Sequence, residues 1–396
     1  MINKVGRLIP DTLPGYAEVR PYSGPFAFQP SGRMAGARLR AQNPATNKVL
    51  ASLEQAIDAT GLKDGMTISF HHHFRNGDFV LNRVVETIAR KGIKGLTLAP
   101  SSLNDINDAI LPHIESGVVT AIETSGARGK LGKTISAGKL ARPAIIRSHG
   151  GRARAIECGE LKIDVAFIGA PCCDKAGNIN GVDGPSACGS MGYAMVDAAY
   201  ADKVVAITDH LVPHPAFPIS IPQTQVDFVV ELDSIGDPAG IASGALRISR
   251  NPRELLIAEY AAAVIEHSGY FNEGYSLQLG SGGASLAAAQ FIREKMKARN
   301  IRGSFGVGGV TAPFVDMLNE GLFSVLFDTQ DFDLPSIESL KNNPRHLEMS
   351  ASYYANPHSG GPIVNNLDVV ILSATEVDVD FNVNVITDSN GIIMGA

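Results

Sequence analysis

Residues 275–309, YSLQLGSGGASLAAAQFIREKMKARNIRGSFGVGG, decide the fold class of this chain. The alternation over Ser276–Leu279 predicts a short buried strand, and Gly280-Ser281-Gly282-Gly283 predicts a turn with almost no side chains. Apolar residues recur at helical spacing from Ala284, and the predicted helix ends before Asn300. A strand, a glycine turn and a helix N-terminus together suit an anion, because their free N–H groups point to one place. The same arrangement also serves packing alone, so this stretch by itself leaves the function open.

The pattern occurs a second time, over Gly65–Pro100. There GMTISF, HHHFRNGD and FVLNRVVETIARKGIKGLTLAP match the strand, the turn and the following helix and strand of the later copy. A second pair agrees, because IDVAFIGAPCCD at Ile163–Asp174 matches LDVVILSATEVD at Leu367–Asp378. Two matched pairs in the same order predict a duplicated α/β unit with a period of about two hundred residues. Since one turn carries histidines and the other glycines, we expect the two halves to face each other and form one site.

Composition and length are those of a multidomain α/β protein. The chain has 396 residues, of which 44% are hydrophobic and 19% charged, with a formal net charge of −6. This length is enough for two or three domains, and the net charge argues against general affinity for nucleic acid. No signal peptide and no membrane-length apolar run is visible, and the four cysteines (Cys158, Cys172, Cys173 and Cys188) form no CxxC motif. We therefore expect a cytoplasmic protein that binds neither membranes nor nucleic acid and holds no metal.

The order of segments predicts three regions. Residues 1–60 are expected to form an irregular arm, rich in Pro, Gly and Arg, followed by a helix at Thr46–Gly61. A first α/β domain is expected over residues 61–225, and a second over residues 226–396. The last residues, Asn384–Ala396, stop without a closing helix, which suggests a truncated chain.

Two further stretches carry chemistry. Adjacent residues on a turn diverge, so His71-His72-His73 do not suit one metal ion, and we expect one or two of them to face a ligand together with Arg75. The alternative is that they satisfy local backbone groups. Residues 124–156 contain eight Lys or Arg and no Asp or Glu, among many Gly and Ser. This basic segment predicts a surface for phosphate or carboxylate, and the alternative is a solvated face.

Five stretches resemble the citrate lyase alpha chain family: GRLIPDTLPGY (6–16), SHGGRARAIECGELKIDVAFIGAPCCDKAGNINGVDGPSACGSMGYA (148–194), VVELDSIGDPAGIASGALRISRNP (229–252), EGYSLQLGSGGASLAAAQFI (273–292) and MSASYYANPHSGGPIVNNLDVVILSATEVDVDFNVNVITDSNGIIMGA (349–396). The resemblance implies two tandem CoA-transferase-like open-sheet domains and citrate CoA-transferase activity. In that activity citrate replaces acetate on a thiol, which is carried by the phosphoribosyl-dephospho-CoA arm of an acyl carrier protein. It also implies no cofactor on this chain itself, and as partners the acyl carrier (gamma) and beta subunits and further copies of this chain.

The resemblance also bears on mechanism. Related enzymes that work through a glutamyl thioester carry Ser-Glu-Asn-Gly after the second glycine turn, whereas this chain has Gly303-Ser304-Phe305-Gly306 there. The missing glutamate favours direct attack of a citrate carboxylate on the acetyl thioester, through an acetyl-citrate anhydride. A thioester hydrolase, a transferase for another carboxylate such as citramalate, and a non-catalytic scaffold remain alternatives.

Candidate site residues follow from this chemistry and from loop position. The glycine turn is expected to stabilise the thioester oxyanion, where one lost donor typically costs about a hundred- to a thousandfold in rate. Its residues are Gly280, Ser281, Gly282 and Gly283. The expected citrate-binding residues are His71, His73, Arg75, Arg147, His149, Gly150, Gly151 and Arg152. The expected residues for CoA or the carrier arm are Arg128, Lys130, Lys133, Gly306, Gly308 and Gly309.

Overall fold

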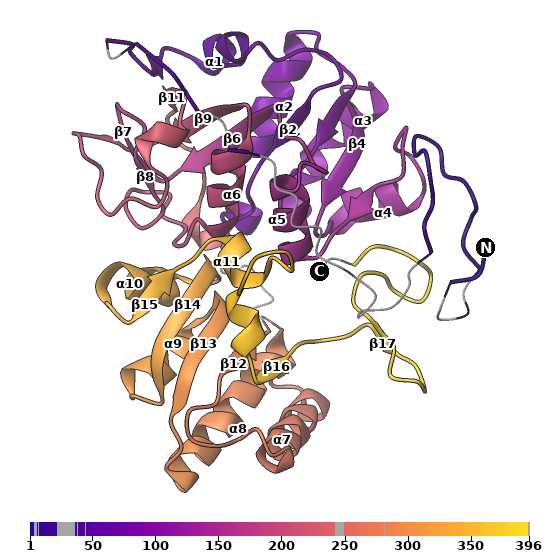
Figure 1. Ribbon diagram of the computed structural model, residues 1–396, viewed down its shortest axis with the longest axis vertical. Helices are drawn as coiled ribbons and strands as arrows, with labels where there is room; N and C mark the ends of the chain where they lie inside the picture. Colours follow the sequence, from indigo (N-terminus) through magenta and orange to yellow (C-terminus); the bar gives the residue numbers. More distant parts are fainter. Residues whose placement is uncertain are drawn as a thin grey trace.

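The computed structural model describes residues 1–3, 6, 8–21, 36–37, 39–43, 45–241, 249–280 and 282–394. Two open parallel sheets, each flanked by helices, form an upper and a lower body in Figure 1. The upper sheet has the strand order β1-β11-β9-β6-β2-β3-β4-β5. Its strands are β1 (Val49–Leu50), β2 (Thr67–Ser69), β3 (Leu96–Leu98), β4 (Val119–Thr124), β5 (Ile145–Ile146), β6 (Val165–Ala170), β9 (Lys203–Thr208) and β11 (Phe228–Glu231). Its helices are α1 (Leu53–Thr60), α2 (Val80–Arg90), α3 (Leu111–Glu115), α4 (Gly129–Ser136), α5 (His149–Glu157) and α6 (Gly192–Tyr200).

The lower sheet has the strand order β15-β14-β13-β12-β16. Its strands are β12 (Leu277–Leu279), β13 (Gly303–Val310), β14 (Phe323–Asp331), β15 (His346–Glu348) and β16 (Val369–Ile371). Its helices are α7 (Pro252–His267), α8 (Gly283–Arg299), α9 (Ala312–Asn319), α10 (Leu334–Asn342) and α11 (Ala351–Ala355). Every pairing within these two sheets is parallel.

The two sheets repeat one topology. In the upper sheet β2, β3, β4 and β5 follow one another outward, and β6 lies on the other side of β2. In the lower sheet β12, β13, β14 and β15 do the same, and β16 lies on the other side of β12. The segments paired by sequence therefore hold equivalent strands, β2 with β12 and β6 with β16. The strand order confirms the duplication that the sequence predicts.

Local sequence explains the main elements. Strand β6 is apolar along its whole length, and β9 is apolar over Val204–Ile207, because helices cover both faces of the upper sheet. Helix α7 begins at Asn251, whose side chain accepts the N–H of Arg253, with Pro252 in its first turn. Helix α8 ends at Asn300, which adopts the left-handed conformation at φ 51°. These boundaries agree with the sequence prediction.

Two expectations need correction. β1 interrupts the predicted helix at Thr46–Gly61, and it pairs with β11 in the upper sheet. β11 also pairs with β9, so the first domain extends beyond residue 225. Val229 and Val230 are both fully buried, and β11 lies between β1 and β9, which holds this segment there. The segment between β14 and Gly361 contains α10, β15 and α11.

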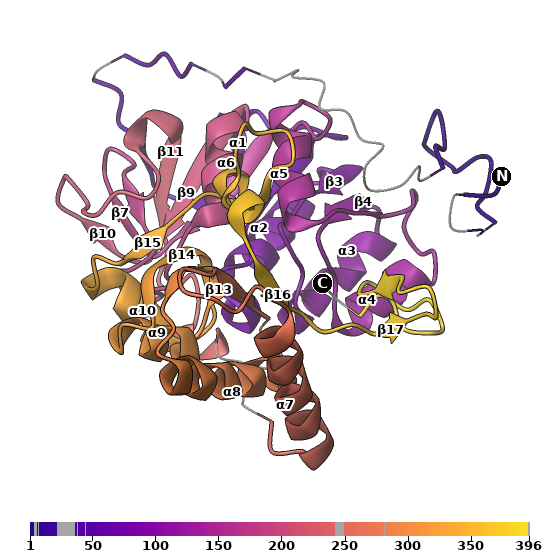
Figure 2. The ribbon, with the colours of Figure 1, turned by 60° about the horizontal axis from the view of Figure 1, so that its bottom comes forward.

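The remaining strands lie outside the two main sheets. β7 (Cys172–Asp174) and β8 (Ile179–Asn180), from the glycine-rich loop of residues 172–192, form a small sheet with β10 (Leu211–Val212). All four cysteines are free. β17 (Glu376–Val377) and β18 (Val383–Asn384) form a hairpin. The C-terminal segment around it lies beside α4, where the Ile393 N–H donates to Ser136 Oγ (Figure 2). No helix among the described residues is long and apolar enough to cross a membrane.

Candidate active site between the two sheets

The expected histidine and glycine turns occupy equivalent places in the two sheets. His71 follows β2, and its Nε2 lies 2.9 Å from the carbonyl oxygen of Gly169 in β6. The Gly280 N–H follows β12 and donates to the carbonyl oxygen of Ile371 in β16 at 2.7 Å. Both places lie at the carboxyl ends of the strands where the strand order reverses. Open α/β sheets bind their ligands at such switch points.

The histidine turn joins the two domains. His73 Nε2 lies 3.2 Å from the carbonyl oxygen of Thr329, and Gln330 Nε2 donates to the carbonyl oxygen of His72 at 3.3 Å. Thr329 and Gln330 lie near the end of β14 in the lower sheet. Within the upper domain, His72 Nδ1 lies 2.6 Å from Ser101 Oγ. The turn therefore connects the carboxyl ends of β2, β3 and β14.

The ring of Tyr193 contacts the rings of three histidines. We call His71, His72, His73, His149 and Tyr193 the histidine cluster. The ring of Tyr193 lies 5.0 Å from that of His72, 5.5 Å from that of His73 and 5.2 Å from that of His149, between centroids. His149 is the first residue of α5, which places it over the turn. Sequence reasoning missed Tyr193, whose only signal is its position after the glycine-rich loop and at the start of a predicted helix.

Burial makes the histidines of the cluster neutral. It lowers the pKa of His71 and of His149 to about 4, with a smaller contribution from the Arg152 charge at His149. It lowers the pKa of His72 and of His73 well below the usual value. At neutral pH these rings therefore offer N–H donors and lone pairs. Burial therefore disfavours a positive charge on His71, His73 and His149, and their role as citrate-binding residues stays a prediction.

Arg75 brings a positive charge to the same junction. It is buried, adopts φ 52°, and its guanidinium carbon lies 4.8 Å from the centre of the Phe332 ring, just beyond β14. Its Nε has no hydrogen-bond partner among the described residues, and none of their carboxylates is in an ion pair with it. Burial, and then the charge of Arg128, lowers its pKa to about 10, so it stays charged at neutral pH. A buried cation without a counter-charge suits an anionic ligand.

The other two arginines of the citrate hypothesis are already paired. Arg152 is buried and donates to both carboxylate oxygens of Asp197 at 2.7 and 2.8 Å, and to the Ala99 carbonyl at 2.7 Å. Arg147 forms ion pairs with Glu123 at 2.9 Å and with Glu160 at 2.7 Å. Both arginines thus neutralise protein carboxylates. Their sequence signal, a basic segment, did not show these partners because the acids come from other elements.

The glycines of α5 allow close packing between the domains. A Cβ on Gly150 would lie 1.8 Å from the carbonyl oxygen of Ala355 in α11, so only glycine fits. The Gly151 N–H donates to Ser148 Oγ at 3.1 Å, which caps α5. Figure 1 shows α11 of the lower domain reaching α5 and α6 of the upper one. These two glycines thus position His149 through the backbone.

The glycine turn is connected to the histidine cluster through a tyrosine and a glutamine. Gln278, two residues before Gly280, donates to Tyr354 Oη at 2.7 Å. Burial, and then the phenol of Tyr354, raises the pKa of Tyr193 well above its usual value. Gly282 is the N-cap of α8 and Gly283 its first residue, and no described side chain caps this end. Ser281 lies outside the described residues.

The residues expected for the carrier arm fall into two groups. Gly308 lies against the side chain of Gln278, and a Cβ on Gly309 would lie 1.9 Å from the Phe332 ring, so both are at the junction. Gly306 instead packs on Leu326 and Phe314 in the core of the lower domain. The basic residues lie at α4: Arg128 is its N-cap, and Lys130 and Lys133 are exposed on it.

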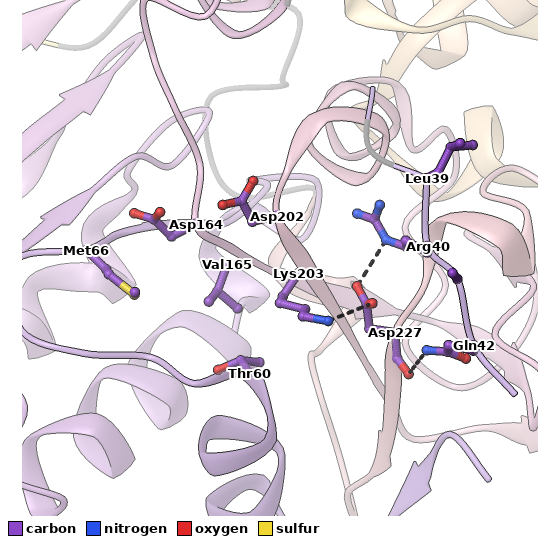
Figure 3. A pocket seen from close by; sticks show the side chains of 11 residues that line it. Leu39, Arg40, Gln42, Thr60, Met66, Asp164, Val165, Asp202, Lys203 and Asp227 are labelled. Atoms are coloured by element: carbon purple, nitrogen blue, oxygen red, sulfur yellow. Dashed lines mark hydrogen bonds and ion pairs between the residues drawn. The ribbon is translucent and has the colours of Figure 1, made fainter. Parts of the chain in front are cut away.

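A separate polar pocket of about 430 Å³ lies at the opposite end of the upper sheet (Figure 3). Asp164, Asp202 and Asp227 each precede one of its strands. Arg40 closes it by donating to Asp227 at 3.0 Å and to the carbonyl oxygens of Ala198 and Ala201. This pocket is where the N-terminal arm packs onto the body, and it is remote from the switch points.

Residues 46–396 match the family model "Citrate lyase, alpha subunit". The chain belongs to this family. It is 54% identical over 349 residues to the citrate lyase alpha chain of Klebsiella pneumoniae, and the aligned region covers 88% of this chain and 69% of that one. It is 52% identical over 370 residues to that of Escherichia coli strain K12, covering 93% and 72%. The predicted family and citrate CoA-transferase activity are therefore confirmed, and citrate lyase alpha chains belong to a multi-subunit enzyme with an acyl carrier partner.

Solved structures agree on the fold. The alpha subunit of citrate lyase from Streptococcus mutans, in complex with citrate, superposes with a TM-score of 0.94 at 52% identity, covering 100% of this chain and 77% of that one. A malonate decarboxylase hetero-tetramer from Pseudomonas, in complex with malonate, superposes with a TM-score of 0.66 at 18% identity, covering 89% and 64%. The predicted CoA-transferase-like fold of two open-sheet domains is thus confirmed.

Proposed function

We propose that this citrate lyase alpha subunit binds citrate at the junction of the two switch points and carries out the acyl exchange there. The observation that carries this is Arg75, a buried guanidinium without a counter-ion among the described residues, next to the histidine cluster and the end of β14. The Streptococcus mutans relative of the same fold binds citrate. We infer that citrate supplies the negative charge that Arg75 lacks.

The histidine cluster would orient the bound citrate. Its rings are neutral, so they can donate N–H hydrogen bonds to carboxylate oxygens without competing for protons at neutral pH. His149 Nδ1 is buried without a partner among the described residues and is the freest donor or acceptor of the cluster. In this proposal Arg75 gives affinity and His72 and His149 give orientation. Arg147 and Arg152 do not contact the ligand, and Gly150 and Gly151 hold His149 in place.

The exchange needs two acyl transfers and no protein nucleophile. A citrate carboxylate oxygen attacks the acetyl carbonyl carbon, the carbon–sulfur bond breaks, and the thiolate leaves an acetyl-citrate anhydride. The thiolate then attacks the citryl carbonyl carbon of the anhydride, and acetate leaves with the bridging oxygen. Strand β13, GSFGVGGV, has no carboxylate that could form a glutamyl thioester in its place. Catalysis would then rest on positioning the two anions and on stabilising the oxyanions.

The glycine turn is the proposed oxyanion site. Gly282 and Gly283 begin α8 without a side-chain cap among the described residues, so their end of the helix has N–H groups to offer. Gly280 holds the turn to β16 through its own N–H, which is therefore occupied. Ser281 is included in the proposed oxyanion site on the basis of the sequence alone. Gly308 and Gly309 give the thioester close access to the backbone beside this turn.

The carrier arm would approach from the side of α4. Arg128, Lys130 and Lys133 lie on this helix, and Arg128 is close enough for its charge to lower the pKa of Arg75. We propose that they bind the phosphates of CoA or of the phosphoribosyl-dephospho-CoA arm of the acyl carrier protein. The gamma and beta subunits and further copies of this chain are the proposed partners, in the cytoplasm.

An oxygen-labelling experiment tests this proposal. The chain is incubated with acetyl-CoA and citrate labelled with ¹⁸O in its carboxylates, under single-turnover conditions, and the products are analysed by mass spectrometry. Direct exchange gives citryl-CoA and acetate with one ¹⁸O, because acetate leaves with the bridging oxygen. A glutamyl thioester would place the ¹⁸O in the enzyme and leave acetate unlabelled. Acetate release without citrate would indicate a hydrolase, and equal turnover with citramalate would overturn the choice of citrate.

A further inference from the structure

A second group of ionisable residues lies beside the proposed active site but takes no part in it. Asp328 and Asp331 in β14 and His346 at the start of β15 are all buried. One carboxylate oxygen of each aspartate and one ring nitrogen of His346 lie within 4.8 Å of one another. Asp328 Oδ2 and His346 Nε2 are 3.5 Å apart, which is longer than a hydrogen bond between such atoms.

An irregularity of the sheet brings the two aspartates together. The register between β13 and β14 shifts between Gly308 and Gly309, so that Thr329 is the extra residue on β14. Residues three apart on a regular strand point to opposite faces, and one extra residue returns them to the same face. Asp328 and Asp331 therefore point to the same side of the sheet, toward β15.

Each of the three side chains uses one polar atom to bind the protein. Asp328 Oδ1 accepts the N–H of Gln330 at 2.8 Å, and Asp331 Oδ2 accepts the N–H of Ser190 at 2.8 Å. His346 Nδ1 lies 3.1 Å from Ser339 Oγ. These contacts fix the orientation of the three side chains. Metal-binding carboxylates and imidazoles are held in this way by their second polar atom.

The other polar atom of each side chain has no hydrogen-bond partner. Asp328 Oδ2, Asp331 Oδ1 and His346 Nε2 are all buried, and no donor within the described part of the chain reaches them. If the Nδ1–H of His346 donates to Ser339, its Nε2 carries a lone pair, so all three free atoms are acceptors. Three buried acceptors facing one another need a positive centre between them.

Nearby charges add to that need. Glu348, on the same strand as His346, is a third, half-buried carboxyl, and its Oε1 accepts the N–H of Met191 at 2.5 Å. Across the described residues, the recorded ion pairs of this group involve only Asp328 and His346, with no Lys or Arg. The described part of the chain therefore pairs no Lys or Arg with this group.

We propose that Asp328, Asp331 and His346 bind a divalent metal ion of the kind that prefers mixed nitrogen and oxygen ligands, Zn²⁺ or Mn²⁺. Carboxylates and imidazole together suit such ions. Two ligands at about 2.1 Å from a tetrahedral ion lie roughly 3.4 Å apart, close to the 3.5 Å between Asp328 Oδ2 and His346 Nε2. The three atoms lie within 4.8 Å of one another, so the widest pair would close by up to about 1.4 Å to complete a tetrahedral site.

The proposed ion would stabilise the contact between the domains. Thr329 and Gln330, which contact His73 and His72, lie between the two aspartates. Asp331 also holds Ser190 of the upper domain. The ion would fix the end of β14 against the histidine turn and against Ser190. The acyl exchange would need no step at the metal.

The test is metal binding by the whole chain, prepared without a histidine tag and without citrate, which chelates metals. After treatment with pyridine-2,6-dicarboxylate, the protein is titrated with ZnCl₂ or MnCl₂, followed by calorimetry, elemental analysis and thermal unfolding. We expect one ion per chain and a rise in Tm. Asp328→Asn and His346→Gln should each weaken binding at least tenfold. Asp333→Asn, two residues beyond Asp331, is the matched control, because asparagine also caps α10 and the metal affinity should not change.

The competing explanation is that the carboxyl groups share protons. Burial raises the pKa of Asp328 to about 7 and that of Asp331 well above its usual value, so protons can take the place of an ion. In that case neither metal binds or changes Tm, and Asp328→Asn is as stable as the wild type because its amide donates to Asp331. That result would overturn the proposal. Should either variant fail to fold, the stoichiometry and thermal shift of the wild-type chain decide alone.

Discussion

The Nδ1 atoms of His71 and His73 lie 2.8 Å apart, and each ring points its Nε2 at a backbone carbonyl. These carbonyls belong to Gly169 in the upper domain and Thr329 in the lower one. Each carbonyl oxygen needs an N–H donor, and the contact between the two Nδ1 atoms needs a third ring hydrogen. All three contacts are therefore hydrogen bonds only when the two rings together carry three hydrogens on nitrogen. Two neutral rings have two. Because burial keeps both rings neutral, one contact must lack its hydrogen. The contact with Thr329, at 3.2 Å, is the longest.

Citrate binding should therefore take up a proton. A bound anion beside the pair raises the pKa of both rings, and the third hydrogen completes the connection to Thr329. Calorimetry of citrate binding at pH 6.5, in buffers of different ionisation enthalpy, should show more proton uptake by the wild type than by His73→Gln. Any change in the protonation of citrate itself is the same for both proteins, so it cancels when their proton uptake is compared. Equal uptake by the two proteins would contradict the shared proton.

His149 predicts how stability depends on pH. Its pKa is lowered to about 4 in the folded protein, against about 6.5 when unfolded. The unfolded state thus binds more protons below pH 6.5, so this residue costs stability as pH falls from 6.5 toward 4. Between pH 7.5 and 5 the free energy of unfolding of the wild type should fall by about 2 kcal/mol relative to His149→Gln. Urea unfolding at both pH values measures this, and parallel changes in the two proteins would refute it.

Arg75 should determine the affinity for citrate. Arg75→Asn removes the charge while asparagine tolerates the left-handed backbone at φ 52°. A charged hydrogen bond is worth about 1.5–3 kcal/mol, so the KM for citrate should rise roughly 10- to 150-fold. Arg147→Gln is the control, because Arg147 is occupied by Glu123 and Glu160 and its loss should leave KM unchanged. An unchanged KM in Arg75→Asn would place citrate elsewhere.

The sequence predicts the fold more completely than the site. Duplication and hydrophobic periodicity are local patterns, so the equivalence of β2 with β12 and of β6 with β16 could be read directly. The partners of a charged side chain are not local. Arg152 looked available because its own segment has no acid, yet Asp197, forty-five residues later, neutralises it. For the same reason the contacts of Tyr193 and Arg75 with rings from distant segments had no sequence signal.

The buried pair of Arg152 and Asp197 should act on stability and not on citrate affinity. Asp197→Asn leaves the guanidinium buried with two of its three hydrogen bonds lost or weakened, which should cost about 3–5 kcal/mol of unfolding free energy. Replacing both residues, as in Arg152→Met with Asp197→Leu, should recover much of that loss, since no uncompensated charge remains. Urea unfolding of the three proteins gives the comparison. A raised KM for citrate with unchanged stability would instead make Arg152 a ligand residue.

Gly150 tests whether the packing of α5 on α11 positions His149. In Gly150→Ala the new Cβ would lie 1.8 Å from the Ala355 carbonyl oxygen, a backbone atom, so the helices must separate. We expect a fall in Tm and a fall in kcat, because His149 moves with the first turn of α5. Gly151→Ala meets only Ser148 Oγ, at 2.8 Å, which can rotate away, so its effect should be smaller. Gly360→Ala meets nothing within 4 Å and should leave both quantities unchanged. If Gly150→Ala lowers Tm but leaves kcat unchanged, the position of His149 does not limit the reaction.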